Sequence, residues 1–347
     1  MTNIYLVRHA EAEGNIYRLA QGHFDGLVTQ RGYEQIRALR RRFEGIHIDA
    51  VYSSDLFRAR TTARAVSEPR NLPIILRREL RELHMGWWEG ETWQEIGRRD
   101  GEQLNCFHRD LSRLHVEGGE SAQEALDRVT AELLRIAAEN EGKTVAVFSH
   151  GAVIRMVLGT LRGLALRDID QSVLGDNTSV SLLAVENGQL REVWGNDRSH
   201  LEAAGLTRFV MRKKGQGGVR FEDGIGYRTP TEEELAVLRQ SGCTVPEGGV
   251  NVGVYQGDHL AGLVHLAGQE GTTGVVDQYY LLPQFRGRGK SFQPMGQAVM
   301  YYRARGCDRL RLVNVPADCQ AYFARFGFIN TTENAMEMSI GYEDREI

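Results

Sequence analysis

The sequence predicts an α/β protein of two domains, and three observations lead to that prediction. The chain has 347 residues, and globular domains commonly hold about 100–200 residues each. Its first half alternates short apolar runs with segments of helical periodicity, which is typical of layered α/β domains. Near residues 195–207 this pattern gives way to small and polar residues, and a glycine-rich stretch dominated by strands follows. We therefore predict one domain over residues 1–205 and a second over 206–347.

The elements expected in the first domain follow one another as strand and helix in turn. Thr29 precedes a helical apolar pattern that it can cap, and Ser121 with Glu124 three residues later fits a capping box. The run Thr-Val-Ala-Val-Phe at 144–148 is the nearly continuous apolar sequence expected of a parallel strand covered on both faces. The predicted strands are 3–7, 50–53 and 144–148, and the predicted helices are 29–43, 58–66, 121–139 and 151–161.

The second domain is expected to hold mainly strands. Residues 255–259 fit a hairpin turn between two of them. The predicted strands are 208–211, 250–255, 260–266, 274–282 and 309–313, and the predicted helices lie near 231–240 and 294–305.

Composition excludes several classes of protein. The chain carries 42 Lys and Arg against 46 Asp and Glu, a formal net charge of −4, so a general nucleic-acid-binding surface is not expected. No apolar run approaches the roughly 18 residues that span a bilayer, and the first residues lack the regions of a signal peptide. The four cysteines have no C-x-x-C spacing and are too few for a disulfide scaffold. We expect a cytoplasmic protein without a membrane partner, and the sequence leaves a homodimer open.

Polar side chains gather where predicted strands end or predicted helices begin. Arg8 and His9 end the first strand, Arg58 follows the second, and His150 ends the most apolar one. Glu82 lies in a loop rich in aromatic and acidic residues. In parallel α/β sheets, sites form beyond the carboxyl ends of the strands, and helix N-termini there favour anions. Two histidines, two arginines and one glutamate are therefore expected to converge on a phosphate.

Five segments in this order resemble the histidine phosphatase (phosphoglycerate-mutase-like) superfamily. Arg8-His9-Ala10-Glu11 stands at that family's Arg-His-Gly/Ala signature, and Gln21–Asp25 resembles the segment before its first long helix. Arg58 occupies the arginine of the Ser-x-Leu-x-Arg-Ala-type motif, Glu82 lies in its Leu-x-Glu segment, and His150 lies in Ser-His-Gly. The resemblance covers about residues 3–201 and implies a three-layer α/β fold.

The resemblance implies a catalytic role for three residues. His9 would attack phosphorus as a neutral imidazole and form a phosphohistidine that water then hydrolyses. Glu82 would protonate the leaving alkoxide and later help to activate water, which needs a raised pKa. His150 would help to stabilise charge on the transferring phosphoryl oxygens.

Four further residues would bind the phosphate. Arg8 and Arg58 would lower the pKa of His9 by like-charge repulsion and would hold the phosphoryl oxygens. Asn15 and the amide of Gly151 would add hydrogen bonds. The resemblance implies no metal, because the arginines supply the positive charge.

Phosphatases and mutases of this family share the same chemistry. Its mutases carry a longer insertion between the acid segment and the second histidine than the stretch from Glu82 to His150 allows. We therefore expect hydrolysis of a small phosphate ester, with a phosphoglycerate-type mutase as the alternative.

A second group of residues follows the strand near 275–282. Glycines in the turn after it permit close backbone approach, and successive amides at a helix N-terminus form a nest suited to pyrophosphate. This segment resembles motif A of the GNAT N-acetyltransferases, and residues 321–328 resemble the family's later Ala…Tyr-x-x-x-Gly-Phe element, so the resemblance spans about 207–342. It implies a C-terminal α+β GNAT fold that binds acetyl-CoA through Leu282, Gln284, Arg286, Gly287, Arg288, Gly289, Lys290 and Ser291.

The sequence departs from the GNAT pattern at the residue that protonates the thiolate. The family's frequent tyrosine aligns best with Phe323, and Tyr322 stands one position earlier. One residue on a helix turns a side chain by about 100°, so Tyr322 is a candidate acid whose direction the sequence does not fix. No clear base for an accepting amine stands out, and Asp277 and Glu270 are the two candidate acids.

Three functions remain open at this point. The first is a bifunctional enzyme for one small metabolite that is both a phosphate ester and an amine. The second is a phosphatase regulated by a catalytically inactive GNAT domain that binds acyl-CoA. The third is a mutase with an assembly module.

Overall fold

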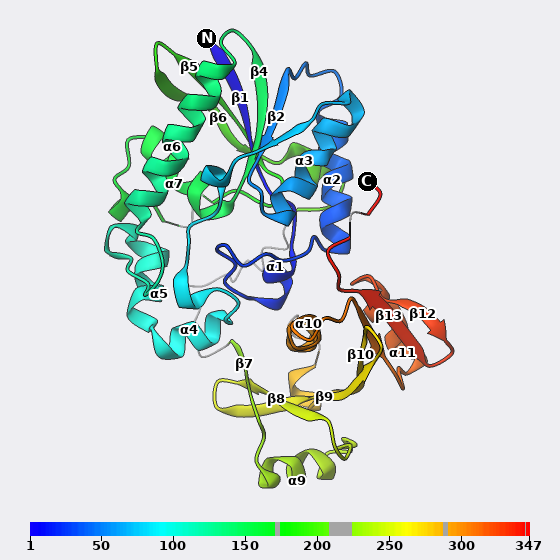
Figure 1. The fold of residues 1–347 in the computed structure, drawn as a ribbon. Helices are drawn as coiled ribbons and strands as arrows, with labels where there is room; N and C mark the ends of the chain where they lie inside the picture. The colour runs from blue at the N-terminus through cyan, green and yellow to red at the C-terminus, as the bar shows by residue number, and fades with distance from the viewer. Residues whose placement is uncertain (171–173, 208–223, 287–290, 344) are drawn as a thin grey trace.

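The computed structural model describes residues 1–170, 174–207, 224–286, 291–343 and 345–347. Within them the chain forms two sheets, each with its own helices (Figure 1). The two-domain α/β and α+β prediction is confirmed. The strand predicted at 208–211 lies outside the described residues, and the boundary at 205/206 stays a prediction.

The first sheet has six strands in the order β3-β2-β4-β1-β5-β6. Strands β1 to β4 pair in parallel, whereas β5 runs antiparallel to β1 and to β6. The sheet is therefore mixed, with a hairpin at its edge that the sequence analysis did not identify. Asn187 and Gly188 at its tip both have positive φ, and an Asn-Gly pair is the usual signal for such a turn. The strands are β1 (Thr2–Arg8), β2 (Ala50–Ser53), β3 (Ile74–Leu76), β4 (Thr144–Ser149), β5 (Val180–Glu186) and β6 (Gln189–Asp197).

The helices of the first domain begin where the sequence places their caps. The Thr29 side chain accepts a hydrogen bond from the Gly32 amide, and Ser121 with Glu124 forms the expected capping box. The longer helices are α2 (Gln30–Arg42), α3 (Phe57–Ser67), α6 (Ala122–Glu139) and α7 (Gly151–Leu161), and the shorter ones are α1 (Glu13–Tyr17), α4 (Trp93–Arg99), α5 (Gly101–Arg109) and α8 (Ser199–Ala203).

Successive residues of the central strands enter two different cores. Ile4 and Leu6 of β1 pack with α6 and α7, whereas Val7 packs with α2 and α3 on the opposite face. In β4, Val147 lies in the core with α6 and α7, and Phe148 lies in the core with α2 and α3. This alternation follows from the period of two in a strand, and it explains why sequences buried on both faces are continuously apolar.

The second domain contains a seven-stranded sheet in the order β12-β13-β11-β10-β9-β8-β7. Only β10 and β11 pair in parallel within the described residues. The predicted hairpin turn at 255–259 joins β8 to β9. The strands are β7 (Ile225–Arg228), β8 (Val250–Gln256), β9 (His259–Glu270), β10 (Thr273–Leu281), β11 (Arg309–Leu312), β12 (Ile329–Thr332) and β13 (Ala335–Ser339), and the helices are α9 (Glu232–Gln240), α10 (Met295–Arg303) and α11 (Ala317–Ala324).

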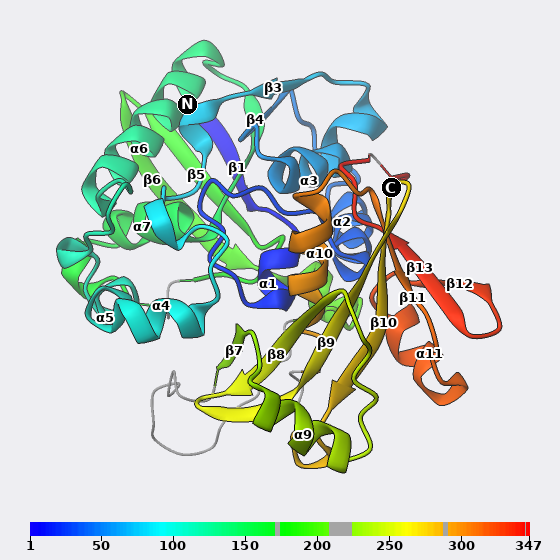
Figure 2. The same cartoon turned by 60° about the horizontal axis from the view of Figure 1, so that its bottom comes forward.

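The two domains contact each other through α1 and α10, which lie side by side in both views (Figures 1 and 2). Tyr17 at the end of α1 is buried among core residues of the second domain and stacks on Phe292, with ring centroids 5.9 Å apart. The domains therefore share apolar packing next to the loop that follows β1.

Candidate active site

The carboxyl ends of three strands meet at one edge of the first sheet. The His9 amide donates to the Ser149 carbonyl, and the Ser54 amide donates to the Phe148 carbonyl. The residues after β1, β2 and β4 are thus tied to one another by backbone hydrogen bonds. This is the arrangement that the parallel order predicts.

His9 is held in the protonation state that nucleophilic attack needs. Its Nδ1 lies 2.7 Å from the Ala10 carbonyl oxygen. Because a carbonyl only accepts, Nδ1 carries the proton and Nε2 keeps its lone pair. Burial, and then the charges of Arg58 and Arg8, hold the pKa of His9 well below 6.5. The predicted arginine effect is present, although burial is the larger cause.

Arg58 is fully buried, and its direction is set by backbone carbonyls. One terminal nitrogen donates to the Phe24 carbonyl at 2.9 Å, and the other donates to the Gly22 carbonyl at 2.7 Å. Its Nε is buried and has no hydrogen-bond partner among the described residues. A buried donor without a partner costs about 1–3 kcal/mol, so a ligand oxygen here would satisfy an unpaired group.

His150 lies beside His9, and their ring centroids are 5.3 Å apart. Its Nε2 is 2.8 Å from the Ser54 hydroxyl, whereas its buried Nδ1 has no partner in the described part of the chain. Burial and the positive charge of Arg58 hold the pKa of His150 well below 6.5. The two histidines and Arg58 therefore form one buried cluster with unsatisfied polar atoms.

The Glu82 carboxylate lies at the N-terminus of α7. It accepts hydrogen bonds from the amides of Ala152 and Val153, at 3.0–3.1 Å, and from its own neighbour Leu83. A helix N-terminus stabilises a negative group, so these amides fix the carboxylate two residues from His150. Sequence analysis placed Glu82 in the site, but it did not identify this anchoring.

Two of the remaining predicted phosphate ligands, Arg8 and Asn15, form hydrogen bonds to backbone groups near the site. Arg8 donates to the Gly175 carbonyl at 2.6 Å. Its side chain lies close to Gly151, because a Cβ added at Gly151 would be 3.1 Å from Arg8 Nε. The Asn15 side-chain oxygen accepts from the Ala12 amide at 2.9 Å, which caps α1. All seven predicted residues thus lie on the segments gathered here, and their individual roles stay predictions.

Sequence analysis missed several residues that fix the backbone of His9. The Asn177 side chain donates to the His9 carbonyl at 3.0 Å, and the Thr178 amide donates to the carbonyls of Arg8 and His9. Thr178 is fully buried with φ of 60°, which is costly for a β-branched residue. Such strain is common at functional sites. Ser54, which follows β2 directly, is the one missed residue that the strand-end rule could have found.

In the second domain, Tyr322 points toward the turn that precedes α10. Its hydroxyl is 2.6 Å from that of Ser291, whereas Phe323 is buried against Tyr279. The offset seen in the sequence therefore leaves the tyrosine on the side of the turn and the phenylalanine in the core. Burial raises the pKa of the Tyr322 hydroxyl, so it keeps its proton at neutral pH.

Only part of the predicted acetyl-CoA turn can be described. Gly287, Arg288, Gly289 and Lys290 lie outside the described residues, and Leu282, Gln284, Arg286 and Ser291 flank them. The pairing of β10 with β11 ends at Val276 and Leu312, so the last five residues of β10 have no described strand on that side. A ligand with amide groups could pair with that free edge. These features fit an acyl-CoA, which would supply the acyl group for transfer.

The acids considered as bases are both engaged in pairs. Asp277 lies 2.5 Å from Nδ1 of His265, whose Nε2 faces the Gly248 carbonyl. Glu270 accepts from Arg311 at 2.7 Å. Neither carboxylate is therefore an isolated proton acceptor in this arrangement.

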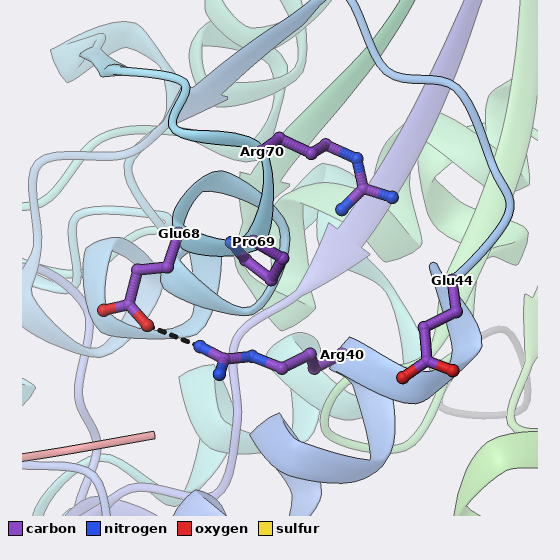
Figure 3. A pocket seen from close by; sticks show the side chains of 5 residues that line it. All are labelled: Arg40, Glu44, Glu68, Pro69 and Arg70. Atoms are coloured by element: carbon purple, nitrogen blue, oxygen red, sulfur yellow. Dashed lines mark hydrogen bonds and ion pairs between the residues drawn. The ribbon is translucent and has the colours of Figure 1, made fainter.

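A surface hollow on α2 and the turn after α3 lies away from these sites. It is lined by Arg40, Glu44, Glu68, Pro69 and Arg70, and Arg40 pairs with Glu68 across it (Figure 3). Among the described residues, no group of three or more His, Cys, Asp or Glu is placed to hold a metal ion. No helix in the described ranges is long and apolar enough to cross a membrane.

Comparisons with known proteins match each half of the chain to one family. Residues 4–198 match the model of the histidine phosphatase superfamily (branch 1), and residues 221–328 match that of the acetyltransferase (GNAT) family. The first half is 34% identical to phosphoglycerate mutase-like protein 4 of Arabidopsis thaliana, over 59% of this chain and 89% of that protein. It is 31% identical to phosphoserine phosphatase 1 of Hydrogenobacter thermophilus, over 54% and 88%.

Two solved structures each cover just over half of this chain. The Bacillus stearothermophilus protein YhfR has 30% identity and a TM-score of 0.56, covering 58% of this chain and 100% of that one. A phosphoserine phosphatase from Entamoeba histolytica, solved with 3-phosphoglyceric acid, has 27% identity and a TM-score of 0.52 over 58% and 100%.

Proposed function

The chain belongs to the histidine phosphatase superfamily over residues 4–198 and carries a GNAT acetyltransferase domain over 221–328, and from this premise we propose that it hydrolyses a small phosphate ester through a phosphohistidine on His9. The observation that carries this proposal is the His9 tautomer. With Nδ1 donating to the Ala10 carbonyl, Nε2 is the unprotonated nitrogen, and its lowered pKa keeps it so at neutral pH.

The surrounding groups supply what the two chemical steps need. Nε2 of His9 forms a bond to phosphorus while the bond to the ester oxygen breaks, and Glu82 is the acid proposed to protonate that oxygen. Arg8, Arg58 and His150 would hold the phosphoryl oxygens as charge shifts onto them. Water then attacks the phosphohistidine, and phosphate leaves.

Hydrolysis is proposed ahead of phosphoryl transfer between hydroxyls. Two observations favour it, namely the short stretch between Glu82 and His150 in the sequence and the likeness to a phosphoserine phosphatase. The likeness to phosphoglycerate mutase-like protein 4 keeps the mutase as the second candidate. A substrate panel should therefore include phosphoserine and 3-phosphoglycerate.

We test this proposal with the full chain in the presence of EDTA. Phosphate release should persist with EDTA and should be lost in His9→Ala, while His47→Ala, which alters an exposed histidine, should retain it. Undiminished release by His9→Ala would refute the proposal. Interconversion of phosphoglycerates without net phosphate release would favour the mutase.

For the second domain we propose transfer of an acetyl group from acetyl-CoA to the amine of a small molecule. The Tyr322–Ser291 hydroxyl pair and the edge of β10 that has no described strand beside it support this. Calorimetry should detect acetyl-CoA binding to the full chain. Binding without transfer to any amine would favour the regulatory alternative, and no binding would refute both.

A further inference from the structure

The segment 13–27 begins with helix α1 and is called loop 13–27 below. It sets the direction of the Arg58 side chain. The carbonyls of Gly22 and Phe24 accept from its two terminal nitrogens, at 2.7 and 2.9 Å. The Asp25 carboxylate accepts from the Phe57 amide at 2.7 Å, which ties the same loop to the start of α3. A shift of this loop would therefore move the guanidinium that faces the proposed phosphate.

The two ends of this loop are joined by one acidic residue. The Glu13 amide donates to the Leu27 carbonyl at 2.9 Å, and the Glu13 carboxylate accepts from the Leu27 amide at 3.0 Å. Glu13 is only 7% exposed. A buried carboxylate with only neutral partners is costly, so it needs a cation.

That cation comes from the second domain. Arg303 at the end of α10 donates to both oxygens of Glu13, at 2.8 and 3.0 Å, and its Nε donates to the Ile340 carbonyl. Both side chains of this pair are largely buried. Two parallel bonds from a fixed guanidinium define a geometry as well as a charge pair, so α10 specifies the position of Glu13.

A second contact reaches the other end of the loop. The Tyr342 hydroxyl donates to the Asp25 carbonyl at 2.5 Å, and its ring packs edge-on against Phe57 at 5.5 Å. The Arg303 guanidinium lies 5.3 Å from the Tyr342 ring. Arg303 and Tyr342 therefore act on the loop as one unit.

The close packing of α1 on α10 depends on a glycine. A Cβ added at Gly296 would lie 2.6 Å from the Tyr17 ring, a distance at which a substitution must displace the ring or the helix. Helices α1 and α10 are therefore in close contact where loop 13–27 meets the second domain.

We propose that Arg303 and Tyr342 are positioning residues for the phosphate site, so that the second domain holds the loop that orients Arg58. Only the kinetic part of the test rests on the proposed phosphatase function. The structural part, that the order of loop 13–27 depends on these two side chains, can be tested without it.

The test compares Arg303→Met and Tyr342→Phe with the wild-type full chain. Arg303→Met removes the bidentate pair but keeps the aliphatic stem, and Tyr342→Phe removes only the hydroxyl. Arg303→Lys keeps the charge without the fork. Arg309→Met is the matched control, because Arg309 forms an exposed ion pair with Glu337 in the same domain.

Four quantities are measured for each variant. They are kcat and KM for p-nitrophenyl phosphate, the affinity for inorganic phosphate by calorimetry, and hydrogen exchange of amides in residues 13–27. For Arg303→Met we expect kcat/KM to fall by about tenfold to a hundredfold, the cost of misplacing a catalytic group. Phosphate affinity should weaken and exchange in 13–27 should rise. Arg303→Lys should lie between, Tyr342→Phe should change less, and Arg309→Met should match wild type.

Several results would overturn the proposal. One is unchanged exchange in 13–27 with unchanged phosphate affinity in both variants. Another is a lower melting temperature with kcat and KM unchanged per folded molecule, which indicates a purely structural role. If Arg303→Met does not fold, Tyr342→Phe decides. If the wild type hydrolyses no ester, the proposed function fails, while exchange and phosphate binding still decide on positioning.

Discussion

The two candidate sites differ in whether their buried polar groups have hydrogen-bond partners. In the first domain, Arg58 Nε and His150 Nδ1 are buried without described partners, and the Arg58 N–H is a donor that an incoming anion could satisfy. In the second domain, the hydroxyls of Tyr322 and Ser291 satisfy each other at 2.6 Å, so a ligand that uses either must break that bond. Polar atoms of the first site are thus left without described partners, whereas the two hydroxyls of the second site bond to each other.

The largest expected effect after loss of the nucleophile comes from Arg58. We expect Arg58→Met to lower kcat/KM by about 10²–10³, the usual cost of removing one preorganised donor to a charged transition state. Because Arg58 lowers the pKa of His9, the acidic limb of the pH profile should also move to higher pH. An unmoved limb would show that Arg58 does not act on His9.

A smaller and more selective effect is expected at Glu82. Glu82→Gln should slow hydrolysis of alkyl phosphates by about 10², the lower range for loss of a general acid. It should hardly affect p-nitrophenyl phosphate, whose leaving group needs no proton. Equal losses on both esters would argue that Glu82 only holds the start of α7.

In the second domain the hydroxyl pair can be broken from either side. Tyr322→Phe should leave acetyl-CoA affinity unchanged and slow acetyl transfer to amines of a screening panel by about 10². Ser291→Ala also breaks the pair but keeps the tyrosine, so transfer at saturating acetyl-CoA should be retained even where the affinity for acetyl-CoA falls. If both variants lose transfer equally, the pair has a structural role.

The smallest expected effect is on stability in acid. His108 and His200 have pKa values lowered to about 4, mainly by burial, whereas unfolded histidines titrate near 6.5. Between these values the unfolded state binds more protons, so the free energy of unfolding falls as pH drops from 6.5 toward 4, by up to about 1.4 kcal/mol per pH unit for each histidine. Melting curves at pH 7 and pH 5 should show this loss. His108→Gln should reduce the pH dependence, and an unchanged dependence would contradict this explanation.

Part of the first site could be predicted because several of its residues are placed by a local rule. His9 and His150 follow buried strands, and parallel strands bring their carboxyl ends to one edge. The caps at Thr29 and Ser121 could also be predicted, because each forms with a residue three positions later in the sequence. Burial as the main cause of the low pKa of His9 was not predictable, because it depends on how α7 and the loops close over the sheet.

The contacts between the domains could not be predicted. Glu13 and Arg303 are 290 residues apart, and neither lies in a pattern that indicates the other. The direction of Tyr322 likewise depends on how α11 packs on β10. Such contacts follow from tertiary packing, which composition and periodicity do not encode.

His9 is proposed to carry the phosphoryl group during turnover, and mass spectrometry of the chain quenched in alkali during hydrolysis of a phosphate ester detects that group directly. We predict one added phosphoryl group on the peptide that contains His9, which disappears as substrate is exhausted and is absent in His9→Ala. Steady phosphate release with no adduct in the wild type, or an adduct that persists in His9→Ala, would contradict the account.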